Sequence, residues 1–143
     1  LSTGDSFTVY RNPKIFDLKH PETFQETETL PIPPDGLVLR PGRLYLVPTK
    51  EIIGSNKYVP VITGRSSIGR IGQSIHQEAG FGDVGFTGHW TLQIKVTYPV
   101  RIYPDLPIAQ VYFITPVGDI RDLYHGKYQD ATTELASKWG MDR

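Results

Sequence analysis

The residues best able to do chemistry in this chain lie within residues 64–93, which read GRSSIGRIGQSIHQEAGFGDVGFTGHWTLQ. The first part of this stretch holds basic and hydroxyl side chains at the expected start of a helix: Arg65, Ser66, Ser67 and Arg70. Backbone N–H groups at a helix start bind anions such as phosphate, and arginine side chains assist them. The same pattern also fits an ordinary capped helix with solvated arginines, so alone it identifies no ligand.

The second part of the stretch, residues 79–88, is rich in glycine and carries one carboxylate, Asp83. Four glycines in ten residues predict positive φ angles or close approach of a ligand to the backbone. Asp83 and Phe86 could offer a carboxylate and an aromatic ring to one sugar, while main-chain groups read a base. A solvated turn aspartate beside a core phenylalanine explains the same residues, and position in the sequence does not decide between the two.

Short β-branched and aromatic runs, separated by 14 Gly and 12 Pro, predict an all-β fold that positions these residues. The expected strands are residues 6–10, 36–39, 44–48, 58–62, 89–96, 100–103 and 108–114. In residues 89–96 the apolar side chains alternate with polar ones, so Gln93 should point away from the main apolar layer. Residues 13–35 are rich in Pro, Thr and Glu and are predicted to form a long surface connection.

One helix is expected, because three isoleucines recur at helical spacing: Ile68, Ile71 and Ile75. Ser66 and Ser67 precede them and are good N-cap residues. Gly69 and Gly72 each weaken such a helix by about 1 kcal/mol relative to alanine, which predicts close packing against another backbone. His76 follows late on this helix and is expected to be structural, since no second histidine or carboxylate partner is evident beside it.

Composition predicts one domain, residues 1–143, whose N-terminus we expect to be incomplete because the chain opens at Leu1. Fifteen basic and fifteen acidic residues leave no net charge, which argues against a nucleic-acid polymer or an anionic membrane as a partner. The absence of cysteine excludes disulfides and mildly favours a reducing compartment, and the histidines show no zinc-ligand spacing. Without a run of about 18 apolar residues, a cytoplasmic location is the expectation.

Taken together, the two parts of residues 64–93 resemble the dCTP deaminase and trimeric dUTPase superfamily. GRSSIGR at 64–70, followed by AGFGDVGFTG at 79–88, fits that superfamily in order and spacing. IAQ at 108–110 resembles its fourth motif, and GKYQ at 126–129 resembles the C-terminal segment of the deaminase branch. The resemblance covers residues 36–129 and is specific, because several spaced motifs agree.

The resemblance implies a distorted β-barrel or jelly-roll subunit with one short helix, assembled as a homotrimer whose three sites lie at subunit interfaces. It implies that dUTP or dCTP is bound with Mg²⁺, which the phosphates themselves would mostly hold. The residues expected to hold the triphosphate are Arg65, Ser66, Ser67, Arg70 and Gln110. The residues expected to close over the phosphates as a lid are Tyr124, Lys127, Tyr128 and Gln129.

The resemblance also assigns the pyrimidine and the sugar. The main chain around Ala79, Phe81 and Gly82 would read the pyrimidine edge. Phe86 would lie against the deoxyribose and leave no room for a 2′-hydroxyl. Asp83 would orient and activate water for attack on the α-phosphorus, while arginines and Mg²⁺ offset the developing charge.

The chain departs from the deaminase branch at Gln93, where that branch has a glutamate. Deamination at C4 of cytosine without zinc needs a group that takes a proton from water and returns it, and glutamine cannot do this. Such acid–base help contributes roughly 10² to 10⁴ in rate. Asp83 and Gln93 together therefore predict an enzyme that hydrolyses dUTP to dUMP and pyrophosphate.

Two alternatives remain open from the sequence. The chain could be a dCTP deaminase, or a bifunctional enzyme that makes dUMP directly from dCTP, in which Gln93 is an inactivating replacement of the glutamate. It could also be a catalytically silent trimer that binds deoxynucleotides and signals their level.

Overall fold

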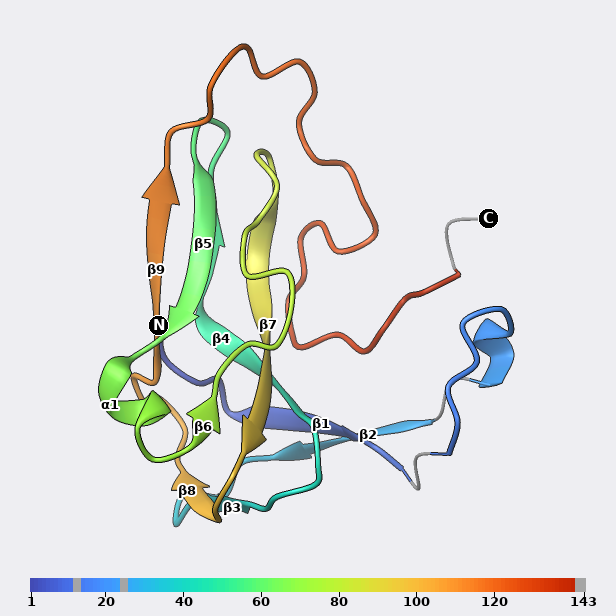
Figure 1. Cartoon of the computed structure of the whole chain (residues 1–143), viewed down its shortest axis with the longest axis vertical. Coiled ribbons are helices and arrows are strands. Elements are labelled where there is room, and N and C mark those ends of the chain that lie inside the picture. Colours follow the sequence, from blue (N-terminus) through green and yellow to red (C-terminus); the bar gives the residue numbers. More distant parts are fainter. Residues whose placement is uncertain (12–13, 24–25, 141–143) are drawn as a thin grey trace.

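The structure is a computed structural model that describes residues 1–11, 14–23 and 26–140 (Figure 1). A five-stranded antiparallel sheet has the order β2-β1-β4-β7-β6. Its strands are β1 (Ser6–Tyr10), β2 (Thr27–Pro31), β4 (Tyr45–Gly54), β6 (Gln73–Ser74) and β7 (Thr87–Val96). Two antiparallel pairs complete the fold: β3 (Leu37–Leu39) with β8 (Val100–Ile102), and β5 (Val59–Gly64) with β9 (Ala109–Ile114).

These elements confirm the mostly β class with one short helix, and each predicted strand overlaps an observed one. Within the described residues the three sheets do not close into a barrel. The predicted barrel closure is therefore not found in the single chain, and the predicted trimer remains a prediction. Among the described helices, none combines the length and apolar character needed to cross a membrane.

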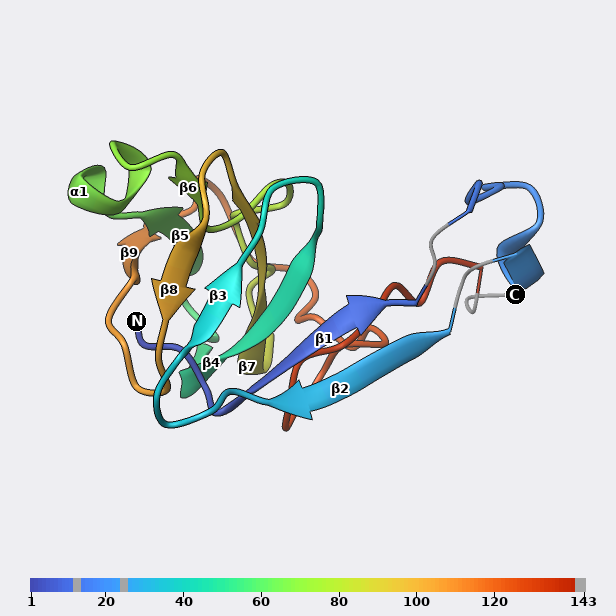
Figure 2. The ribbon, with the colours of Figure 1, turned by 90° about the horizontal axis from the view of Figure 1, so that it is seen from below.

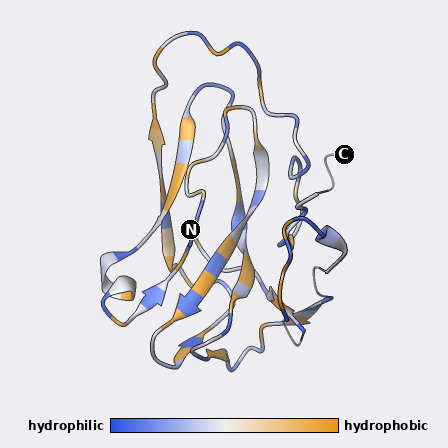
Figure 3. Ribbon diagram, turned by 45° about the vertical axis from the view of Figure 1, so that its right-hand side comes forward, coloured by the Kyte–Doolittle hydropathy of each residue, from blue (hydrophilic) through white to orange (hydrophobic). Residues whose placement is uncertain are grey.

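The core forms where β4 pairs with β7, the strand with the clearest alternation (Figure 3). Tyr45 lies opposite Ile94 and Val47 opposite Leu92, and both β7 side chains are fully buried. Every second residue of β7 faces this core, so the residues between them face the other side, as predicted. The Gln93 side chain therefore points to the side of β7 opposite the apolar core.

The helix is much shorter than predicted: α1 (Ser66–Gly69) is a single turn. Arg65 occupies its N-cap position without a side-chain cap, so the prediction of a serine cap is wrong. The chain then turns at Gly72, which has φ of 77°, and an added Cβ there would lie 2.7 Å from Thr97 Cβ. Beyond it the chain extends as β6 against β7. Of the three isoleucines, Ile68 alone lies in α1; Ile71 lies in the following turn, and Ile75 is buried in the bend after β6.

Residues 13–35 are not the plain connection that the sequence predicted. They contain a short 3₁₀ turn, Pro21–Thr23, and β2, which pairs with all of β1 (Figure 2). β2 is a mostly exposed edge strand, so it lacks the buried alternation by which strands are recognised. Residues 13, 24 and 25 of the predicted connection lie outside the described residues.

The chain after residue 114 has no helix or strand in its described part and returns along β7 and β1 (Figure 1). The backbone N–H of His89 donates to Ala131 O over 2.8 Å, and Asp130 N donates to Thr87 O over 3.0 Å. Glu134 is buried and accepts hydrogen bonds from hydroxyls of β1. This C-terminal segment is therefore bound to the backbone edge of β7 and to β1, and its residues Ala131 and Leu135 lie beside the β7 face that carries Gln93.

Candidate active site

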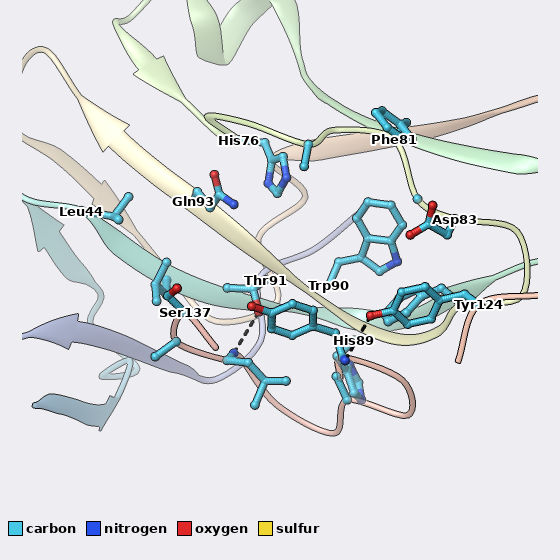
Figure 4. A pocket seen from close by; sticks show the side chains of 18 of the residues that line it. Leu44, His76, Phe81, Asp83, His89, Trp90, Thr91, Gln93, Tyr124 and Ser137 are labelled. Carbon is cyan, nitrogen blue, oxygen red and sulfur yellow. Dashed lines mark hydrogen bonds between the residues drawn. The ribbon is translucent and has the colours of Figure 1, made fainter. Parts of the chain in front are cut away.

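A pocket of about 490 Å³ lies between the polar face of β7, residues 76–86 and the C-terminal segment (Figure 4). The predicted site residues that line it are Ala79, Phe81, Gly82, Asp83, Phe86, Gln93, Tyr124 and Tyr128. The structure thus brings together the residues expected at the base and the sugar with those expected to do the chemistry.

Three aromatic rings form one wall of the pocket. Phe86 is buried and meets Trp90 edge-on, with ring centroids 5.7 Å apart, and meets Tyr124 in the same way at 5.8 Å. The Trp90 indole N–H donates to Ile53 O over 3.3 Å. Gly82 packs directly on this indole, because an added Cβ would lie 2.5 Å from Trp90 Cζ2. Such a fixed apolar wall suits a sugar or a flat ring.

The backbone of residues 79–82 is held on β5. Ile62 N donates to Gly80 O over 2.6 Å, and Gly82 N donates to Pro60 O over 2.7 Å. Extended backbone alternates the direction of its hydrogen bonds, so the N–H and C=O of Phe81 point away from β5. Ala79 adopts a positive φ of 56°, where the chain enters this segment. The main-chain groups of Phe81 are therefore not bonded to β5, and their role in reading a base remains a prediction. Gly85 confirms the predicted positive φ at 98°.

Asp83 is exposed and lies at the end of the pocket near Trp90 (Figure 4). Its backbone carbonyl accepts the N–H of Phe86 over 3.2 Å, which closes the turn between them. Among the described residues that line the pocket, Asp83 supplies the single carboxylate.

Gln93 lies on the opposite side of the pocket, half-buried on β7. Its Oε1 accepts the backbone N–H of Glu78 over 3.1 Å, which fixes the orientation of the amide beside the pocket. His76 lines the pocket beside it (Figure 4). Burial lowers the pKa of His76, although a hydrogen bond to the Ala79 backbone acts in the opposite direction.

Sequence reasoning missed several pocket residues. His76 was predicted to sit on a helix with a structural role, whereas it lies on the pocket wall. His89 and Thr91 share the face of Gln93, so the alternation of β7 was a signal that could have found them. Leu135 reaches the pocket from the C-terminal segment, where its N–H donates to Thr91 Oγ1 over 2.9 Å, and no sequence pattern indicated this.

The predicted triphosphate residues lie elsewhere, on α1 and at the paired ends of β5 and β9, and they do not line the pocket. All of their side chains are exposed. Arg65 Nη1 donates to Pro107 O over 2.9 Å, and Gln110 Nε2 donates to Gly64 O over 3.1 Å. Ser66, Ser67 and Arg70 complete this group.

The predicted lid residues bind other parts of the C-terminal half of the chain. Gln129 accepts the N–H of Thr87 and donates to Gly85 O over 3.1 Å. Lys127 Nζ donates to Lys138 O over 3.0 Å, and Tyr128 OH accepts the Lys138 N–H. Within one chain they cover the Phe86 side of the pocket and do not meet the predicted triphosphate residues.

Among the described residues, no group of three His, Asp or Glu side chains could hold a metal ion. The predicted role of Mg²⁺ depends on phosphate oxygens, which are ligands that Mg²⁺ prefers. Asp83 is the carboxylate of the pocket that a phosphate-bound Mg²⁺ could approach.

The family model for dCTP deaminase-like proteins matches residues 1–115. These residues include β1 to β9 and all pocket residues except those of the C-terminal segment. The chain belongs to the dCTP deaminase-like family. This finding confirms the resemblance on which the site prediction was based.

Curated members of the family are similar over most of this chain. A protein of Clostridium botulinum (strain Alaska E43 / Type E3), named dCTP deaminase, dUMP-forming, is 50% identical over 131 residues, which are 91% of this chain and 73% of the relative. A protein of the same name from Leptospira biflexa serovar Patoc (strain Patoc 1 / Ames) is 49% identical over 113 residues, 79% of this chain and 63% of the relative.

A solved structure shows the same fold. The 2′-deoxycytidine 5′-triphosphate deaminase from Agrobacterium tumefaciens aligns with a TM-score of 0.56 and 22% identity. The alignment covers 79% of this chain and 36% of that one.

Proposed function

We propose that this chain is a dUMP-forming dCTP deaminase, which removes the 4-amino group of dCTP and cleaves the triphosphate to leave dUMP and pyrophosphate. The observation that carries the proposal is one pocket that joins an aromatic wall, a carboxylate and a polar wall, in a chain 50% identical to a relative named for this reaction. Formation of dUMP from dCTP replaces dUTP hydrolysis, the function predicted from the sequence, as the preferred function. Asp83 keeps its predicted role in activating water.

Cleavage of the triphosphate is assigned to Asp83. Its carboxylate takes a proton from water, the water oxygen bonds to the α-phosphorus, and the bond to the bridging oxygen breaks. Pyrophosphate leaves, and dUMP stays against Phe86. The position of Asp83 at the Phe86 end of the pocket supports this, because the α-phosphate is attached to the sugar.

Gln93 is assigned to holding the pyrimidine. Its carbonyl oxygen already accepts the Glu78 N–H, so its amide N–H groups are assigned to an acceptor of the base other than N3. An amide carries no titratable proton near neutral pH, so Gln93 cannot move the proton that deamination requires. For this reason dUTP hydrolysis without deamination is the second candidate function, and Gln93 is the observation that favours it.

We also propose that the complete site combines two subunits of a homotrimer. The separation of the exposed triphosphate residues from the pocket supports this, since one chain does not bring the two groups together. Apolar side chains of β9 remain exposed in the single chain, including Tyr112, Phe113 and Ile114, each about half exposed. Mixing inactive Asp83→Asn chains with inactive Arg70→Ala chains should restore activity in mixed trimers, and persistent inactivity would contradict a shared site.

The substrate test uses the purified protein with Mg²⁺ and either dCTP or dUTP, with products separated by chromatography and ammonia assayed in parallel. Ammonia and dUMP from dCTP support the deaminase. Formation of dUMP from dUTP, with dCTP unchanged, supports the second candidate. Inactivity on both substrates contradicts both candidate functions and favours the alternative of a catalytically silent nucleotide-binding protein.

A further inference from the structure

We propose that His76 carries the proton of the deamination step, the role that Gln93 cannot perform. The inference rests on the proposed deaminase function and adds a catalytic residue to it. It also revises the structural role that the sequence predicted for His76.

The placement of His76 is the first argument. His76 and Gln93 both line the pocket, and Figure 4 shows them on the same side of it. The Glu78 N–H donates to Gln93 over 3.1 Å, which ties the segment containing His76 to the middle of β7. The imidazole therefore lies beside the group assigned to hold the pyrimidine, and next to Ala79, whose main chain is assigned to the base edge.

The hydrogen-bonding state of the ring is the second argument. His76 Nδ1 is buried and has no hydrogen-bond partner among the described residues. A buried polar atom without a partner is destabilising, and a ligand or water that supplies a partner recovers the lost free energy. A pyrimidine edge or an attacking water that reaches this nitrogen would supply the missing hydrogen-bond partner.

The protonation state is the third argument. Burial lowers the pKa of His76, so the ring is neutral near pH 7 and its free nitrogen can accept a proton. The other titratable groups that face the pocket or flank the ring are Tyr10, Glu78, Asp83, His89, Tyr124 and Tyr128. Of these, His89 uses its Nδ1 in a 2.7 Å contact with Thr49 O, and Asp83 lies at the sugar end of the pocket. Glu78 lines the neighbouring cavity and not this pocket, so His76 is the titratable side chain of the pocket that lies on the Gln93 side.

The step balances with His76 as the carrier. The water oxygen bonds to C4 while His76 takes one water proton and delivers it to N3. His76 then takes the second proton from the new C4 hydroxyl and delivers it to the amino group. The C4–N bond breaks, ammonia leaves, and the ring becomes uracil, with His76 returned to its neutral form.

The test compares His76→Asn with a matched control, His20→Asn, an exposed histidine that does not line the pocket. His76→Asn should lower kcat for ammonia release from dCTP by roughly 100-fold or more, with KM within about threefold and hydrolysis of dUTP retained. In His76→Asn, the fall of kcat toward low pH, which protonation of His76 causes in the unaltered chain, should disappear. Adding Gln93→Glu to His76→Asn should restore ammonia release. His20→Asn should behave as the unaltered chain.

Each result decides the inference. Unchanged ammonia release in His76→Asn rejects it and leaves the deaminase function standing. An unaltered chain that hydrolyses dUTP but makes no ammonia from dCTP rejects both. If His76→Asn does not fold, NMR of the unaltered chain with ¹⁵N-labelled histidine replaces the activity measurement. Addition of dUMP should shift the nitrogen resonances of His76 most among the histidines. An unshifted His76 rejects the inference.

Discussion

The replacement Glu134→Gln should release the C-terminal segment from the pocket without unfolding the protein. The Glu134 side chain is 5% exposed and accepts hydroxyl hydrogen bonds from Ser6 and Thr8, each over 3.0 Å, and from Thr133. Two of these donors belong to β1, so the carboxylate fastens the segment to the main sheet. Gln keeps the size of Glu but replaces one accepting oxygen with a donor.

The magnitude follows from these contacts. A hydrogen bond to a charged group contributes about 1.5–3 kcal/mol, and all three bonds lose the charge on replacement. Hydroxyls can rotate to accept from the new amide, so part of the energy is retained. We expect the segment to open more easily by about 2–3 kcal/mol, which is roughly a 30- to 150-fold rise in its opening equilibrium.

Native-state hydrogen exchange measures this opening directly. The informative amides are Leu135 N–H, bonded to Thr91 Oγ1, and His89 N–H, bonded to Ala131 O. The matched control is Glu28→Gln, which removes an exposed carboxylate paired with Arg11 and should leave both amides unchanged. Equal exchange in the two variants, or faster exchange of every core amide alike, would refute the reasoning.

Four further predictions concern the pocket. Asp83→Asn should reduce pyrophosphate release by roughly 10² to 10⁴ with folding and assembly retained, and an active variant would remove its assigned role. Gln93→Glu should increase ammonia release from dCTP, and no increase would argue against a proton-limited deamination step. Gly82→Ala places a Cβ 2.5 Å from an indole carbon and should cost about 1–3 kcal/mol in thermal unfolding, whereas Gly69→Ala, with open space around its Cβ, should cost no more than a few tenths. Because the folded pKa of His76 lies below its ordinary value of 6.5, the unfolded chain binds the proton more readily; stability should fall as pH drops below about 6.5, and melting curves of His76→Asn should lack this part of the fall.

The parts of the fold that the sequence predicted are those with a buried face. The alternation along β7 predicted both the strand and the outward direction of Gln93, because a two-residue period follows directly from strand geometry. The glycines around Asp83 predicted the turn that places it beside Phe86, because positive φ and close packing both favour glycine.

The parts that escaped prediction depend on contacts distant in sequence. β2 is an exposed edge strand and carries no hydrophobic period. The helix of α1 ends early because Gly72 turns against Thr97, a partner 25 residues away along the chain. The same turn moves His76 from a helix to the pocket wall, so its chemical environment could not be inferred from local spacing.

The central claim is that one pocket both deaminates the base and cleaves the triphosphate. The most direct measurement is the ratio of ammonia to dUMP formed from dCTP under single-turnover conditions, with dUTP monitored throughout. One ammonia should form for each dUMP, without accumulation of free dUTP. Formation of dUMP from added dUTP, with no ammonia from dCTP at any enzyme concentration, would contradict the claim.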